Sequence, residues 1–114
     1  MDSWEYTIAA LDSLMRIMNE RAGEIRGDIH ALTTTERLIV SARDLLLVWS
    51  RISAEVIKGN IPTGELELSR GALAAAIKIA DIVATSKDPV GERVVRWQQE
   101  TVFHRERYRA KGQW

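Results

Sequence analysis

The arginine and aromatic residues near the C-terminal end of the sequence are of the types that bind charged molecules. On a helix, where successive residues lie 100° apart, six polar residues between positions 93 and 111 share a stripe about 80° wide. The stripe consists of Arg93, Arg96, Glu100, His104, Arg107 and Lys111. Trp97 and Tyr108 border it on one side and Phe103 on the other. Arginines beside aromatic rings can hold phosphates while the rings stack on bases, so the pattern is compatible with a nucleic-acid surface.

The same stripe has two other interpretations. It could bind an acidic protein surface, or its cations could simply complement the negative end of the helix dipole. Trp114 follows a predicted helix stop at Gly112, and tryptophan is frequent among interface hot spots. The predicted binding residues are therefore Arg93, Arg96, Trp97, Phe103, His104, Arg107, Tyr108, Lys111 and Trp114.

Glu20 and Glu24 lie one helical turn apart and are the first candidates for metal chemistry. Helical nucleotide pyrophosphohydrolases hold magnesium with two acidic pairs on facing helices, because phosphate chemistry needs clustered carboxylates. Glu65, Glu67 or Asp81 could supply a second pair, but Glu65 and Glu67 are two residues apart and point to different sides of a helix. A magnesium-dependent nucleotide pyrophosphohydrolase is thus a second alternative function.

The two histidines, His30 and His104, do not match a metal-site pattern. Glu100 and His104 are four residues apart, whereas metal sites in helical bundles use Glu-x-x-His from two helices. The chain has no cysteine, which excludes thiolate zinc sites and cysteine nucleophiles. It also has no serine-nucleophile motif and no phosphate-binding glycine loop. We therefore expect a non-enzymatic protein without a metal or cofactor.

Four predicted helices would position these residues. Over the first 25 residues the apolar side chains are spaced by three and four, which is a heptad pattern. Gly23 and Gly27 weaken the end of this helix. However, Ile29 and Leu32 keep the spacing, which leaves open a bend instead of a stop.

The second helix is predicted to begin at a capping box formed by Thr33 and Glu36. Lys58, Gly59 and Asn60 form a stop signal, since glycine and asparagine tolerate the left-handed conformation. The predicted core positions are Leu38, Ala42, Leu45, Trp49, Ile52 and Val56, widened by Ile39, Leu46 and Ile57.

The third helix is capped by residues 63–65, and its small residues at 71–76 would let a partner helix approach closely. Asp88 as N-cap and Pro89 as the first helical residue begin the fourth helix. Its expected core face has Val90, Val94 and Thr101 at its centre. The expected core positions of the third helix are Leu66, Leu73, Ile77, Ala80 and Ala84.

Helices at about 3–27, 34–58, 64–86 and 89–111 predict a single domain spanning 1–114. Short loops favour an all-α, antiparallel, up-down four-helix bundle, with completion of the core by dimerisation as the competing arrangement. Sixteen basic and sixteen acidic residues give a net charge of zero, which excludes a bulk polyelectrolyte. The segment up to Asp28 carries −3 and the segment from Lys87 carries +3. These segments are expected to lie side by side or to pair between subunits.

No apolar run approaches the roughly 18 residues of a membrane-spanning helix, and the acidic N-terminus is not a secretory signal. We therefore expect a cytoplasmic protein with no membrane partner. The heptads and start signals are generic and identify no family. The sequence predicts a small interaction protein (a regulator, inhibitor or adaptor, such as phage or mobile-element proteins that act on host machinery). Its predicted partner is another protein, with nucleic acid as the alternative and a homodimer left open.

Overall fold

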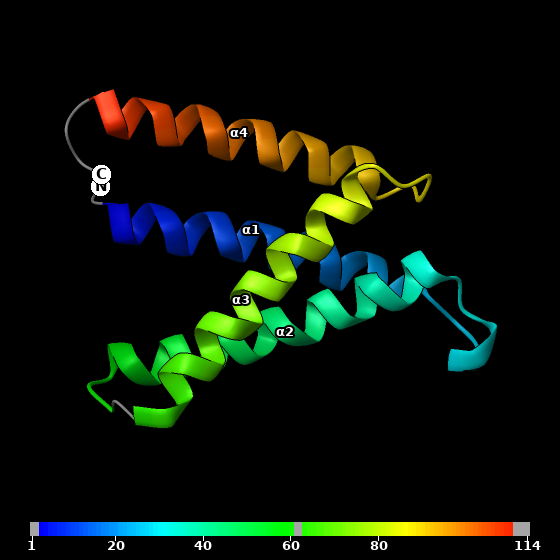
Figure 1. Ribbon diagram of the computed structural model, residues 1–114, viewed down its shortest axis with the longest axis horizontal. Coiled ribbons are helices and arrows are strands. Elements are labelled where there is room, and N and C mark those ends of the chain that lie inside the picture. The colour runs from blue at the N-terminus through cyan, green and yellow to red at the C-terminus, as the bar shows by residue number, and fades with distance from the viewer. Residues whose placement is uncertain (1–2, 61–62, 111–114) are drawn as a thin grey trace.

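The computed structural model describes the backbone of residues 3–60 and 63–110, and the side chains of residues 8–28, 30–60 and 64–101. Within these residues the chain forms four α-helices and one short 3₁₀ helix, with no strand (Figure 1). The elements are α1 (Ser3–Glu24), η1 (Ile29–Ala31), α2 (Thr34–Ile57), α3 (Thr63–Ala84) and α4 (Gly91–Ala110). The predicted all-α four-helix bundle is confirmed.

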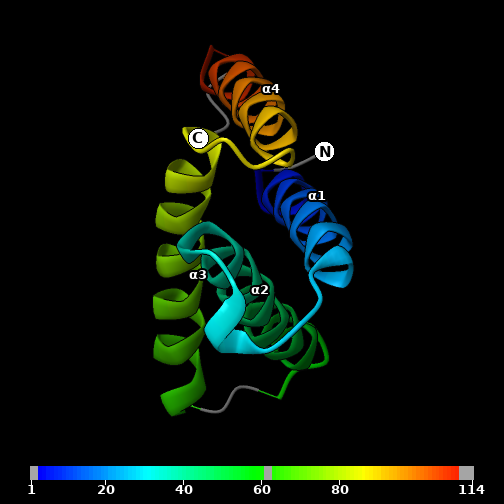
Figure 2. The ribbon, with the colours of Figure 1, turned by 90° about the vertical axis from the view of Figure 1, so that its right-hand side faces the viewer.

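The four helices form two layers. Figure 2 shows α4, α1 and α2 stacked on one side and α3 on the other, where it crosses the stack diagonally in Figure 1. α3 packs most extensively on α2, and α4 runs antiparallel beside α1. The shortest extent is only 18 Å, and the radius of gyration of 15.1 Å exceeds the roughly 13 Å of a compact chain of this length. The bundle is therefore flat.

The sequence left open whether the first helix stops or bends near its glycines, and α1 stops there. The helix ends at Glu24, before the predicted residue 27, and Gly27 has a left-handed φ of 107°. The Asp28 carboxylate then accepts a hydrogen bond from the His30 backbone N–H (3.0 Å), where η1 begins. A bend that continued the helix through residue 32 is therefore wrong, because α1 ends at Glu24 and Gly27 takes a left-handed conformation.

Local signals define both ends of α2 as predicted. Thr33 Oγ1 accepts from the Glu36 N–H (3.1 Å), and Glu36 Oε1 accepts from the Thr33 N–H (2.9 Å), which completes the capping box. Gly59 adopts a φ of 89° after the last turn. Ile57 is 65% exposed, so its predicted core position is wrong; it is the last residue of the helix, next to the Gly59 turn.

The buried face of α3 differs from the predicted one. Leu66 and Leu73 are only half-buried and Ile77 is 39% exposed. Small side chains occupy the core face because they let α3 approach α2 closely, which excludes the larger side chains from the contact. The buried residues of α3 are Ser69, Ala72, Ala76, Ala80 and Val83.

α4 begins at Gly91, two residues after the predicted start at Pro89. Asp88 nevertheless caps the chain as expected, since its Oδ1 accepts from the Val90 N–H (3.0 Å). Val90 and Val94 are buried and Thr101 is half-buried, as the predicted core face requires.

All four helices contribute to one hydrophobic core. It occupies the part of the molecule where the end of α1, the start of α2 and the α3–α4 connection meet, which we call the closed end. The last turns of α2 and the first turns of α3 project away from it and form the hairpin end (Figure 1). The core residues are Leu14, Ile17, Met18, Ala22, Ile39, Ala42, Leu46, Ala76, Ala80, Val83, Val90 and Val94.

Candidate interaction surfaces

Two polar contacts fasten α4 to α1. Arg93 Nη1 lies 2.8 Å from Glu20 Oε2, and the Trp97 indole N–H donates to the Ala10 carbonyl oxygen (2.7 Å). The first contact joins the basic C-terminal segment to the acidic N-terminal one, so the two oppositely charged segments do lie side by side. Arg93 and Trp97 were predicted to bind a partner, and the structure gives both of them a contact within the chain.

A third contact fastens α4 to α3, where Gln98 Nε2 donates to Asp81 Oδ1 (2.7 Å). The remaining side of α4 is exposed. Arg96 lies on it, without an ion-pair partner in the described part of the chain. The exposed side chains of this outer face are Glu92, Arg96, Gln99 and Glu100.

The other predicted binding residues cannot be placed on this face. Their side chains lie outside the described residues, although the α4 backbone is helical to Ala110. They are Phe103, His104, Arg107, Tyr108, Lys111 and Trp114.

The proposed magnesium carboxylates already have cations beside them. Arg93 contacts Glu20 at 2.8 Å, and Arg21 Nη1 lies 3.9 Å from Glu24 Oε2. Glu67 is likewise 3.3 Å from Arg70. Among the described residues, no group of three or more histidine, cysteine, aspartate or glutamate residues could hold a metal ion.

The most buried ion pair among the described side chains joins residues 67 positions apart. Arg21 donates from Nε to Asp88 Oδ1 (2.9 Å) and from Nη2 to Asp88 Oδ2 (3.0 Å), a two-point contact that fits a guanidinium to a carboxylate. The two side chains are 16% and 7% exposed. Arg21 Nη2 also lies 3.9 Å from Glu36 Oε2, so one guanidinium connects α1, α2 and the α3–α4 connection.

This contact also changes the protonation of Asp88. The hydrogen bonds from Arg21 hold the pKa of the Asp88 carboxyl below its usual range, against the opposing effect of burial. The backbone N–H of Val90 adds a smaller lowering. The carboxylate therefore stays charged and caps α4 while it binds α1.

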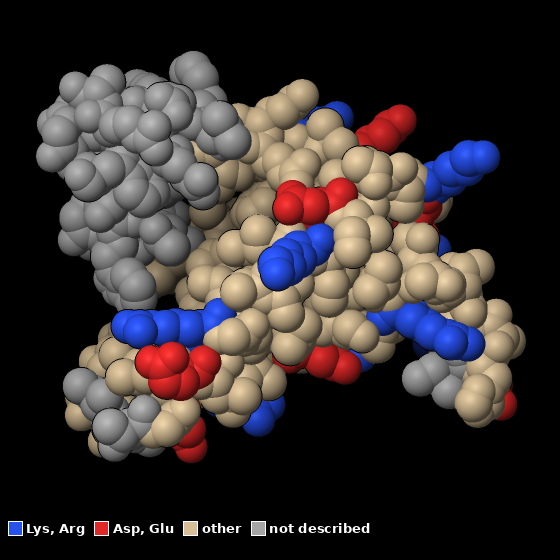
Figure 3. Space-filling model, in the orientation of Figure 1, with Lys and Arg blue, Asp and Glu red and all other residues tan. Residues whose placement is uncertain are grey.

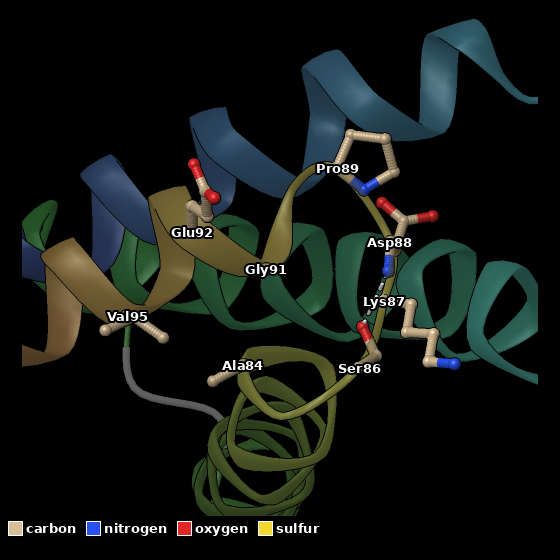
Figure 4. A pocket seen from close by; sticks show the side chains of 8 residues that line it. All are labelled: Ala84, Ser86, Lys87, Asp88, Pro89, Gly91, Glu92 and Val95. Carbon is tan, nitrogen blue, oxygen red and sulfur yellow. Dashed lines mark hydrogen bonds between the residues drawn. The ribbon is translucent and has the colours of Figure 1, made fainter.

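A recess of about 720 Å³ lies at the α3–α4 connection (Figure 4). Its charged side chains do not converge, since Figure 4 shows Lys87 and Glu92 pointing away from each other. The backbone turns tightly beside the recess. A Cβ at Gly91 would lie 3.1 Å from the Val83 carbonyl oxygen and 3.3 Å from that of Ser86. The recess is part of this turn, and its lining brings no reactive groups together.

A groove of about 370 Å³ lies between α2 and α3 at the hairpin end. Leu68 lines it and is 59% exposed. The sequence analysis did not predict this groove. The available signal was Leu68, which falls off the apolar spacing of its helix, together with Val48 and Ile52 one turn apart on α2. The lining residues are Val48, Arg51, Ile52, Glu55, Glu65 and Leu68.

Charges of both signs are interspersed over the face of the molecule that α3 covers (Figure 3). No single-sign patch stands out among the residues coloured there. None of the helices in the described ranges is long and apolar enough to cross a bilayer. Comparisons with protein-family models, curated proteins and solved structures found no match to this chain.

Proposed function

We propose that the protein is a small helical interaction protein that binds another protein through the outer face of α4. The observation that carries the proposal is the way α4 is held. Arg93 and Trp97 fasten it to α1, and Gln98 fastens it to α3. These contacts fix the orientation of the helix, so that Arg96 faces solvent at a defined position.

The charges of this face favour a protein partner over nucleic acid. Arg96 has Glu92 one turn before it and Glu100 one turn after it, and all three side chains are exposed. Carboxylates so close would repel phosphates, whereas surfaces that bind nucleic acid are strongly positive. Mixed charges suit a protein interface, where each charge meets its opposite on the partner. The partner would present an acidic group opposite Arg96.

A regulator, inhibitor or adaptor acting in the cytoplasm is the role that fits such a protein, because binding alone is then sufficient for its effect. The nucleic-acid alternative depends on Phe103, His104 and Arg107, which continue the basic and aromatic stripe in the sequence. It is tested together with the protein proposal.

Affinity capture from cells that encode the protein, followed by binding of the purified partner, tests the proposal. Arg96→Glu should weaken partner binding at least about tenfold, because it removes one cation and adds one anion at the contact. Arg16→Glu is the matched control, since Arg16 is an exposed arginine on α1 for which the described residues offer no ion pair. It should leave binding unchanged.

Two results would contradict the proposal. Equal binding by the wild type and the Arg96→Glu variant would remove the outer face of α4 from the interface. Retention on DNA or RNA that falls steeply with salt, and is lost in Arg96→Glu, would establish the nucleic-acid alternative.

A further inference from the structure

The groove at the hairpin end leaves one large apolar side chain in water. Val48 and Ile52 line it from α2 and Leu68 from α3. Leu68 is 59% exposed, whereas Val48 is half-buried and Ile52 is buried. An exposed leucine beside a groove with apolar walls is typical of a contact surface. We propose that a second copy of the chain covers this groove and forms a two-fold symmetric dimer.

The charges around the groove identify a second copy as its occupant. Glu55 is already neutralised within the chain, since its carboxylate accepts from Asn60 Nδ2 (3.1 Å) and lies 3.6 Å from Lys58 Nζ. Arg51 on the α2 side and Glu65 on the α3 side have no ion-pair partner among the described side chains. The groove thus presents one uncompensated cation and one uncompensated anion, on opposite walls.

Such a surface is complementary to itself when the symmetry axis runs along the groove between the two helices. A two-fold rotation about that axis places α2 of one copy over α3 of the other, without changing the height of any residue along the helices. Arg51 then faces Glu65 of the partner subunit, and the pair forms twice. An axis across the groove would place α2 over α2 and would not set Arg51 opposite Glu65.

The same arrangement covers the apolar groups. Leu68 lies over the α2 wall of the partner, which carries Val48 and Ile52, so the exposed leucine of each groove enters the other groove. The two hairpins together form a second set of four packed helices beyond the core of each chain. The dimer uses no residue of α4, and the proposal is therefore independent of the proposed function.

Light scattering coupled to size-exclusion chromatography of the full chain measures the dimer directly. The wild type should have twice the chain mass of 12.9 kDa at high concentration. Leu68→Glu should be monomeric, because it places a carboxylate in the apolar contact. Ile77→Glu is the control, since Ile77 is a partly exposed residue nine positions away and hence on the opposite flank of α3. It should remain a dimer, with circular dichroism confirming that both variants fold.

A charge exchange separates self-association from any other contact. Arg51→Glu alone and Glu65→Arg alone should each raise the dimer dissociation constant about tenfold, because each places like charges opposite each other twice. The double variant restores both pairs and should return the constant to near that of the wild type.

A monomeric wild type at high concentration would overturn the proposal. So would a double variant as weak as the single ones, or a dimer that persists in Leu68→Glu. Each of these results leaves the Arg96 experiment unaffected.

Discussion

The closed end and the hairpin end use the same residue types in opposite ways. At the closed end Arg21 binds Asp88 through two hydrogen bonds, and Leu14 is completely buried. At the hairpin end Arg51 has no ion-pair partner in the described part of the chain, and Leu68 is mostly exposed. The difference follows from coverage, because α1 and the start of α4 cover only the closed end. We therefore expect stability to be concentrated at the closed end, and the hairpin end to be available for contact.

The largest expected effect on stability compares the buried Leu14 of the closed end with the exposed Leu68 of the hairpin end. Leu14→Ala should lower the free energy of unfolding by about 3 kcal/mol, because it removes buried methyl groups and leaves a cavity. Leu68→Ala should change it by less than about 0.5 kcal/mol, because the side chain is already in water. Urea titrations followed by circular dichroism, at one low protein concentration so that self-association does not contribute, measure both. Similar losses of unfolding free energy in the two variants would show that the two ends do not differ in stability.

The next largest effect on stability compares Arg21 of the closed end with Arg51 of the hairpin end. Arg21→Ala should lower the free energy of unfolding by about 2–3 kcal/mol, since it leaves the Asp88 carboxylate mostly buried without its partner. Arg51→Ala should cost less than about 0.5 kcal/mol under the same conditions. If Arg21→Ala is as mild as Arg51→Ala, the closed end does not depend on this contact.

The smallest effect is a dependence on pH. Because Arg21 lowers the pKa of Asp88 in the folded state, the contact stabilises the fold above the ordinary carboxyl pKa of about 4. This stability is lost as the pH falls through the lowered pKa of the folded state. Asp88→Asn should therefore be less stable at neutral pH and should lose less stability between neutral pH and about pH 3. Asp44→Asn, which changes an exposed aspartate on α2, should keep the wild-type pH profile.

The parts of the fold that local chemistry determines could be read from the sequence. The capping box at Thr33, the stop at Gly59 and the cap at Asp88 each involve residues within three positions of one another. The face of α3 could not be read in the same way. Spacing and size favoured Leu73 and Ile77, whereas the close approach of α2 selected alanines, and that approach is a property of two helices together.

The candidate interaction surfaces could likewise be predicted only in part, because they depend on how the helices pack together. The stripe on the last helix was visible as a pattern, but its division into fastening residues (Arg93, Trp97) and an outward residue (Arg96) depends on where α1 lies. The Arg21–Asp88 contact and the hairpin groove join segments distant in sequence. Spacing within one helix gives only an indirect signal for the groove, the off-pattern Leu68, and none for the Arg21–Asp88 contact.

Gly91 has a mechanical consequence. The carbonyl oxygens of the last turn of α3 close over the first residue of α4, leaving no room even for a methyl group without a shift of backbone. We therefore expect α3 and the start of α4 to move together as one rigid unit. The turn at Gly59 differs, because a Cβ there would meet nothing within 4 Å and only the left-handed φ of 89° favours glycine.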